Sequence, residues 1–179
     1  MDIEVEIKCL LTREQYISLL AFFSANAQKL KEDEQETQYL DAGVDVRIQQ
    51  NKENAKLILK GGKVHDEMRQ EIEVNVARTD FPKLERIFSA IGLKPKVKWF
   101  RKRHAFQWGD ISVAVDATKG YGYILELEQM ATFSTQDAAL KLLKEKAQEL
   151  GVTITPREQF DKMFEHYVEN WEVLVKEHK

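Results

Sequence analysis

Along this chain, charged and aliphatic side chains alternate in several short stretches, which is the pattern of a β-strand whose two faces differ. The first stretch covers residues 3–10, where Glu4, Glu6 and Lys8 share one face and aliphatic residues together with Cys9 fill the other. Because most such stretches are joined by short turns, we expect one antiparallel sheet or barrel. The alternation predicts further strands at residues 28–40, 44–49, 55–60, 69–76, 97–108, 112–118 and 124–130.

In the remaining segments, hydrophobic side chains recur at helical spacings of three and four residues. One of these segments opens with Thr12 and Gln15 at the spacing of a capping box, and another opens with Asp80 as the expected N-cap and Pro82 in the first turn. The apolar side of that second helix consists of Leu84, Ile87, Phe88 and Ile91. Amphipathic helices need a surface to cover, so we expect them on the aliphatic faces of the strands, in an α+β fold. The predicted helices are residues 12–27, 80–91 and 134–150, and a last one that begins after Pro156.

The chain has 179 residues, a length that suits a single domain over residues 1–179, with residues 156–179 as a C-terminal helical segment. Hydrophobic residues make up 43% and charged residues 32%, which excludes a disordered chain, and the net charge of -3 gives no reason to expect nucleic acid as a partner. The single cysteine, Cys9, excludes an intrachain disulfide and a multi-cysteine zinc site. The start of the chain lacks a secretory signal pattern and the longest apolar run is residues 19–23, so we expect a cytoplasmic protein with no membrane partner.

The charged faces of the predicted strands hold acids and bases in a repeating arrangement. Glu-x-Glu occurs on three separate strands, at residues 4–6, 71–73 and 126–128, and basic residues gather on the others. Charges of both signs that face a shared interior suit a polyanion held together with metal ions, because lysine and arginine neutralise phosphate oxygens and carboxylates bind Mg²⁺ or Mn²⁺. The alternative is that these charges are the solvated face of a half-covered antiparallel sheet.

The run Glu4-Val5-Glu6-Ile7-Lys8 resembles the amino-terminal E-x-E-x-K signature of the CYTH domain. This family is also called the triphosphate tunnel metalloenzymes and includes class IV adenylyl cyclases and thiamine triphosphatases. The resemblance implies an eight-stranded antiparallel closed β-barrel, a tunnel that binds a triphosphate and one or two divalent cations, Mg²⁺ or Mn²⁺. Further motifs follow in the family's order, namely Tyr39-Leu40-Asp41, Val46-Arg47, Lys60-Gly61, Arg69-x-Glu71-x-Glu73, Arg101-x-Arg103, Val115-Asp116, Gly120-x-Gly122 and Glu126-Leu127-Glu128.

The resemblance also implies a role for each matched residue. The metal ligands would be Glu4, Glu6, Glu126 and Glu128, with Asp116 beside them. The phosphate-binding residues would be Lys8, Arg47, Lys60, Arg101 and Arg103, with Arg69 as a weaker candidate. Glu71 and Glu73 would lie on the tunnel floor and orient basic residues, a second metal or water. The residues expected to act directly in catalysis are Glu4, Glu6, Lys8 and Asp116. Lys56 matches no family position, and we interpret it as an exposed lysine.

Three departures from the family limit the choice of substrate. Gln49 stands where many members have a second arginine, and Asp45 stands where vertebrate thiamine triphosphatases have tryptophan. The His-Phe pair that often precedes the signature in class IV adenylyl cyclases is missing. Trp99 shares the face of Arg101, where it would either stack on a substrate base near the tunnel mouth or pack in the core or at the rim.

The predicted function is divalent-metal-dependent hydrolysis of inorganic, nucleoside or thiamine triphosphate by a monomer or homodimer. One alternative is an adenylyl cyclase that makes cyclic AMP from ATP. A second alternative is a noncatalytic module that binds polyphosphate or nucleotide.

Overall fold

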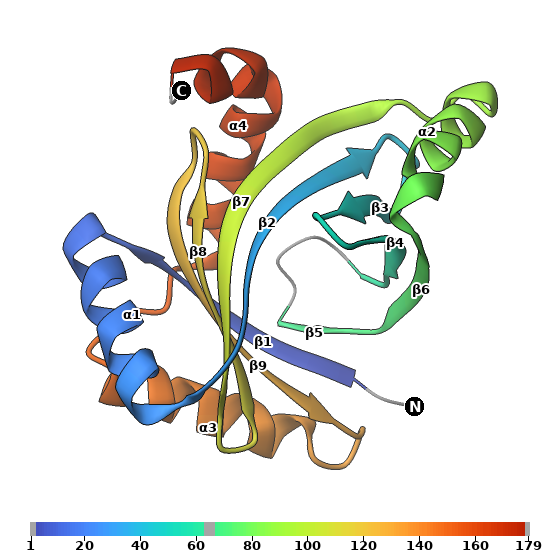
Figure 1. Ribbon diagram of the computed structural model, residues 1–179. Helices are drawn as coiled ribbons and strands as arrows, with labels where there is room; N and C mark the ends of the chain where they lie inside the picture. The colour runs from blue at the N-terminus through green and yellow to red at the C-terminus, as the bar shows by residue number, and fades with distance from the viewer. Residues whose placement is uncertain (1–2, 63–66, 178–179) are drawn as a thin grey trace.

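A computed structural model describes residues 3–62 and 67–177, and Figure 1 shows an antiparallel sheet curved around a central space, with helices on its outside. The strands lie close to the predicted ranges, because each alternating stretch pairs with its neighbour over most of its length. The strands are β1 (Ile3–Leu11), β2 (Gln28–Leu40), β3 (Asp45–Gln50), β4 (Asn54–Lys60), β5 (Met68–Arg69), β6 (Glu71–Ala77), β7 (Pro95–Trp108), β8 (Ile111–Thr118) and β9 (Gly122–Ala131). The helices are α1 (Arg13–Asn26), α2 (Phe81–Ala90), α3 (Gln136–Glu149) and α4 (Arg157–Glu177), and a 3₁₀ turn (Arg78–Asp80) precedes α2.

The sheet has the strand order β5-β1-β9-β8-β7-β2-β3-β4-β6. Only Gln70 separates β5 from β6, so these two segments form one bent strand and the sheet has the eight strands that were predicted. On one side of the bend the Glu6 amide donates to Glu67 O, and on the other the Gly61 amide donates to Gln70 O, both at 2.8 Å. The expected closed barrel is therefore only partly correct, because the covalent chain at Gln70, rather than a hydrogen-bonded ladder, joins the two ends of the sheet.

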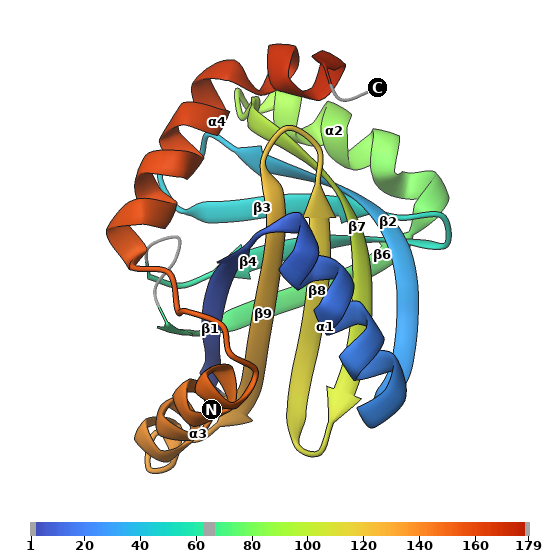
Figure 2. The same cartoon turned by 90° about the vertical axis from the view of Figure 1, so that its left-hand side faces the viewer.

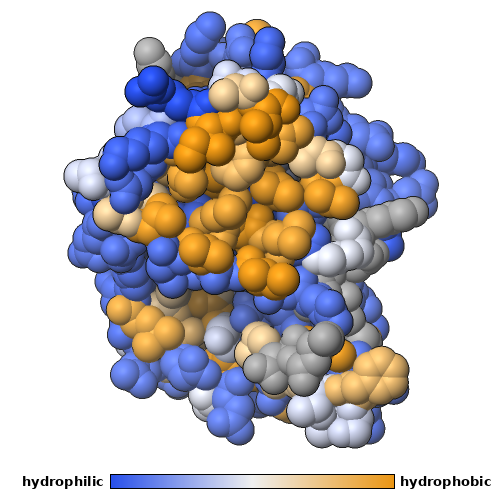
Figure 3. All heavy atoms as spheres, turned by 90° about the vertical axis from the view of Figure 1, so that its right-hand side faces the viewer, coloured by the Kyte–Doolittle hydropathy of each residue, from blue (hydrophilic) through white to orange (hydrophobic). Residues whose placement is uncertain are grey.

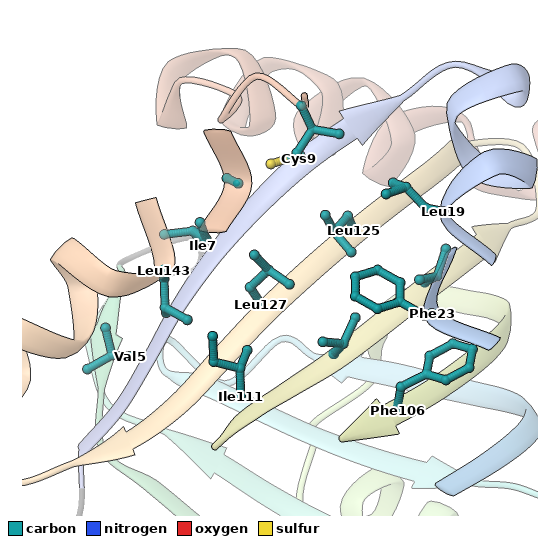
Figure 4. Close-up of a cluster of buried hydrophobic side chains, with 14 of the residues drawn as sticks. Val5, Ile7, Cys9, Leu19, Phe23, Phe106, Ile111, Leu125, Leu127 and Leu143 are labelled. Atoms are coloured by element: carbon teal, nitrogen blue, oxygen red, sulfur yellow. The ribbon is translucent and has the colours of Figure 1, made fainter. Parts of the chain in front are cut away.

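The largest part of the core lies on the outer side of the sheet, where β1, β8 and β9 pack against α1 and α3 (Figure 2). The aliphatic positions predicted for the first strand are here, and Val5 and Cys9 are fully buried. Figure 4 shows Phe23 of α1 and Leu143 of α3 among these side chains. Thr12 and Gln15 form the predicted capping box at the start of α1. Burial of the aliphatic faces against these helices leaves the charged faces of the same strands to turn inward.

Helix α4 packs on a second, mainly aromatic cluster at one end of the sheet. Trp99 of β7 lies 5.0 Å from Tyr167 of α4 and 4.5 Å from Tyr121, measured between ring centroids. Tyr167 is fully buried, and its hydroxyl donates to the carbonyl oxygens of Lys98 and Lys119 at 3.3 and 3.1 Å. The aromatic stripe of the last helix is thus a packing surface that covers this end of the curved sheet.

Helix α2 covers less of the sheet than its sequence indicated. Phe81 is buried against β3 and β4, but Ile87 and Ile91, which were expected on the packed side, are 56% and 65% exposed. Ile72 and Val74 on the outer face of β6 are also at least half exposed, and Figure 3 shows the resulting apolar patch. The predicted packing of helices on the aliphatic strand faces therefore does not extend to β6.

Asp80 is the N-cap residue of α2, as predicted. Its side chain makes no capping bond, because Asp80 also ends the 3₁₀ turn and has helical backbone angles. Its carboxylate accepts instead from Lys83 at 2.6 Å. Among the described helices, none is both long and apolar enough to cross a membrane.

Candidate functional site

The inner face of the sheet encloses a cavity of about 430 Å³. Alternate residues of seven strands contribute to its wall. On the six strands other than β2, the charged face predicted from the sequence is the inner one. Asp116 does not line the cavity but is buried behind Arg101 and Arg103, and the side chain of Arg69 lies outside the described residues. The predicted site residues that line the cavity are Glu4, Glu6, Lys8, Arg47, Lys60, Glu71, Glu73, Arg101, Arg103, Glu126 and Glu128.

Lys60 links three strands across the interrupted part of the ladder. Its ammonium lies 2.8 Å from both carboxylate oxygens of Glu4 on β1 and 2.6 Å from Oε2 of Glu71 on β6. Burial raises the pKa of Glu4 to about 8, and Glu6 adds to the rise although Lys60 opposes it. Burial acts to lower the pKa of Lys60, but the carboxylates of Glu6 and Glu4 outweigh it and raise that pKa. The single positive charge of Lys60 therefore cannot neutralise all the carboxyl groups that surround it.

Asp116 on β8 holds the two arginines of β7. Its carboxylate accepts from Arg103 at 2.6 to 3.1 Å and from Nη1 of Arg101 at 3.2 Å. Arg103 also pairs with Glu126 of β9. Although burial acts to raise the pKa of Glu126, Arg103 and then Lys8 lower it to about 2. These charge-assisted bonds fix both guanidinium groups at the cavity wall, because the shared acceptor, Asp116, is only 1% exposed.

A group of carboxylates forms on the facing strands β1 and β9. The ladder register places Glu6 opposite Glu128 and Lys8 opposite Glu126, and the ammonium of Lys8 lies 2.5 Å from Oε1 of Glu6. Burial raises the pKa of Glu128, and repulsion from Glu6 raises it further. Crowded carboxylates of this kind are stabilised by added positive charge, which a hard divalent cation supplies.

Arg47 lies nearer the end of the cavity that α4 covers. Its guanidinium makes two bonds to Asp45, with Nε to Oδ1 at 2.7 Å and Nη2 to Oδ2 at 2.5 Å. It also stacks on Tyr39, 4.3 Å from the ring centroid. Asp45 and Tyr39 thus position Arg47, which is the role that planar guanidinium contacts favour.

The other end of the cavity opens to solvent. Lys56 and Glu73 line it, form an ion pair at 2.6 Å, and keep 31% and 32% of their side-chain surface exposed. The interpretation of Lys56 as an exposed lysine is therefore wrong, since it turns to the inner face with Lys60. Three uncharged residues, Gln35, Thr37 and Gln49, complete this part of the wall.

A scan against family models matches the CYTH domain over residues 2–158. This match covers most of the chain. The protein belongs to the CYTH family. The search of curated proteins returned no match.

Several solved structures resemble this CYTH protein. A conserved hypothetical protein from Pyrococcus furiosus is 24% identical, with a TM-score of 0.75, and the alignment covers 86% of this chain and 96% of that one. A candidate adenylate cyclase from Vibrio parahaemolyticus is 14% identical, with a TM-score of 0.73 and coverage of 91% and 98%. A Hippeastrum protein, first regarded as an adenylyl cyclase and described as having a dominant triphosphatase activity, is 18% identical, with a TM-score of 0.68 and coverage of 93% and 96%. At these identities the likeness shows a shared fold.

Sequence reasoning missed several residues of the CYTH cavity. Gln35, Thr37 and Tyr39 lie on β2, whose sequence is polar on both faces, so alternation gave no sign of which face is inner. Asp45 shares the inner parity of Arg47, and that two-residue spacing was the available signal. Phe164 reaches the cavity from α4, which no local pattern in the sequence indicates.

The donor chemistry of this CYTH cavity fits a divalent cation. Within the described part of the chain, no three His, Cys, Asp or Glu side chains are arranged as a metal site. Glu4, Glu6 and Glu126 instead pair with Lys60, Lys8 and Arg103. Carboxylate oxygens are nevertheless the ligands that Mg²⁺ and Mn²⁺ prefer, and the raised pKa values of Glu4 and Glu128 indicate acids with too little positive charge around them.

Proposed function

We propose that this CYTH protein is a divalent-metal-dependent triphosphatase that hydrolyses inorganic triphosphate or an organic triphosphate such as a nucleoside or thiamine derivative. The observation that carries the proposal is one cavity in which the cations and acids of six strands converge. A triphosphate has many charged oxygens along a short chain, and a narrow cavity with cations on several walls can neutralise them together. The described fold of the Hippeastrum triphosphatase is consistent with this reaction.

The proposed roles divide by strand. Glu4 and Glu6 of β1 and Glu126 and Glu128 of β9 would hold Mg²⁺ or Mn²⁺. The bound ion would neutralise charge that develops on phosphate oxygens and make water a better nucleophile. Phosphate groups would be bound by Lys8, Arg47, Lys60, Arg101 and Arg103.

Each of these cations is paired with an acid in the structure, so binding requires an exchange of partners. Lys60 can turn from Glu4, and Arg103 from Glu126, toward a phosphate oxygen once those acids face a metal ion. Asp116 also counts among the proposed metal ligands, yet its bonds to Arg101 and Arg103 favour a positioning role. Arginines held in place lose little side-chain entropy when substrate binds, which favours contacts that strengthen in the transition state.

The test is a panel of inorganic triphosphate, ATP and thiamine triphosphate, each with Mg²⁺ or Mn²⁺, with products resolved by chromatography. We expect metal-dependent release of orthophosphate. A folded wild-type protein that releases no product from any of the three would overturn the proposal. Glu6→Gln, which keeps the size of the side chain, should lose turnover, and wild-type turnover in that variant would remove Glu6 from the metal site.

A second candidate reaction is cyclisation of ATP, because the similar structure from Vibrio parahaemolyticus is described as a candidate adenylate cyclase. The same cavity would then exclude water and accept the ribose 3′-hydroxyl as the nucleophile. The products separate the two reactions, since cyclisation gives pyrophosphate and cyclic AMP whereas hydrolysis gives orthophosphate.

A further inference from the structure

The uncharged residues of the cavity wall, Gln35, Thr37 and Gln49, are linked by hydrogen bonds in which the donor and the acceptor can be assigned. Nε of Arg101 donates to Oε1 of Gln35 at 2.8 Å, and Nε2 of Gln35 donates to Asp33 at 3.2 Å. A guanidinium can only donate and a carboxylate can only accept, so these two partners fix which end of the Gln35 amide is oxygen.

The orientation of Gln35 in turn fixes the orientation of Gln49. Nε2 of Gln49 donates to Thr37 Oγ1 at 2.8 Å and to Gln35 Oε1 at 3.4 Å. Both N–H bonds of Gln49 are therefore used within the wall. Its carbonyl oxygen, Oε1, accepts from no donor among residues 3–62 and 67–177, although Gln49 is only 6% exposed and lines the cavity. Gln49 thus presents a hydrogen-bond acceptor.

Gln49 lies at the end of the cavity that is open to solvent. The ladder register places it opposite Thr37 on β2 and opposite Lys56 on β4. Lys56 is partly exposed, as described above, whereas Trp99 and Tyr167 at the other end are 7% and 0% exposed beneath α4. A group attached to the end of a triphosphate chain can therefore extend past Gln49 to solvent.

The chemistry of an acceptor at this point is selective. Phosphate oxygens are themselves acceptors and carry negative charge, so a carbonyl oxygen repels them, whereas it attracts the N–H and O–H groups of an organic head group. An arginine at this position would instead attract a further phosphate, because a guanidinium is a charged donor. On the basis of the proposed triphosphatase function, we propose that Gln49 is a specificity-determining residue that contacts a donor group on the head group of an organic triphosphate, such as a nucleoside, and favours it over inorganic triphosphate.

The experiment compares kcat/KM for ATP and for inorganic triphosphate with Mg²⁺. Gln49→Met keeps the length of the side chain but removes the acceptor. We expect it to lower the ratio of kcat/KM for ATP to kcat/KM for inorganic triphosphate at least tenfold, mainly by lowering kcat/KM for ATP. Gln49→Arg should lower the same ratio by improving the inorganic substrate. Thr37→Ser is the matched control, because it removes a methyl group from the same wall and keeps the hydroxyl oxygen that accepts from Nε2 of Gln49. It should change both substrates equally.

A ratio within threefold of wild type in Gln49→Met and Gln49→Arg would overturn the inference. A fall in the ratio that is as large in Thr37→Ser would also overturn it, because the effect would then belong to the packing of the wall rather than to the acceptor. If the wild type turns over neither substrate, the triphosphatase proposal fails. The ratio of the two dissociation constants, measured by calorimetry on the same variants, then tests the preference by itself.

Discussion

Glu4→Gln should make the metal-free protein more stable than the wild type, by an amount that increases with pH, although it removes a proposed metal ligand. Glu4 is 5% exposed, and its carboxyl, ordinarily with a pKa of 4.5, has a pKa of about 8 in the fold. Between these values the unfolded chain has lost the proton and the folded chain keeps it, so the stability of the wild type falls with rising pH. At about 1.4 kcal/mol per pH unit, the upper limit of the loss is about 5 kcal/mol.

The measurement is urea unfolding followed by tryptophan fluorescence at pH 5 and pH 8, with EDTA present. Lys60 retains Glu71 in the variant, so the substitution leaves no buried ammonium without a partner. We expect the free energy of unfolding of the variant, relative to that of the wild type, to rise by about 2 to 4 kcal/mol from pH 5 to pH 8. The control is Glu73→Gln, which makes the same chemical change on the same wall at a side chain that is about a third exposed, where solvent screens charge interactions. The reasoning would be refuted if the difference in free energy of unfolding between Glu4→Gln and wild type were the same at both pH values, or if it favoured the wild type more at pH 8.

Three further predictions follow from the same structure. Arg103→Ala should raise KM about tenfold to a hundredfold, because it removes a charged donor worth about 1.5 to 3 kcal/mol, and steady-state kinetics with an unchanged KM would contradict the phosphate role. Cys9 is fully buried and burial raises the pKa of its thiol to about 12, so Ellman's reagent at pH 8 should react only after unfolding, and rapid labelling of the native protein would be the contrary result. Phe23→Ala should lower the free energy of unfolding, measured by urea titration, by about 3 to 5 kcal/mol. Phe133→Ala, at an 82% exposed side chain, should change it by less than about 0.5 kcal/mol. Equal effects of the two substitutions would be inconsistent with the described core.

Strands with unlike faces were the most predictable part of this fold. In β1 the aliphatic side chains face α3 and the charged side chains face the cavity. The alternation of residue types in the sequence therefore indicates both environments directly. The capping box of Thr12 and Gln15 is similarly local. In β2 the outer face is also polar, with Gln38 donating to Glu85 of α2 at 2.7 Å, so its inner residues could not be identified from alternation.

Features that depend on distant parts of the chain were not predictable. Ile72 and Val74 have the alternation of a covered strand, but α2 is too short and too far along the sheet to cover them. The bend at Gln70 follows from pairing with β1 on one side and β4 on the other, which no local spacing indicates. The ion pair of Lys56 on β4 with Glu73 on β6 likewise depends on strand register.

An experimental structure with Mn²⁺ and inorganic triphosphate is the most direct test that the inner face of the sheet is the metal and phosphate site. We expect an anomalous peak inside the cavity within ligand distance of carboxylates from both β1 and β9. The triphosphate should contact Lys60 and Arg103, with Lys60 released from Glu4. Mn²⁺ or triphosphate bound only on the outer surface, with Lys60 still paired to Glu4, would contradict the proposed site.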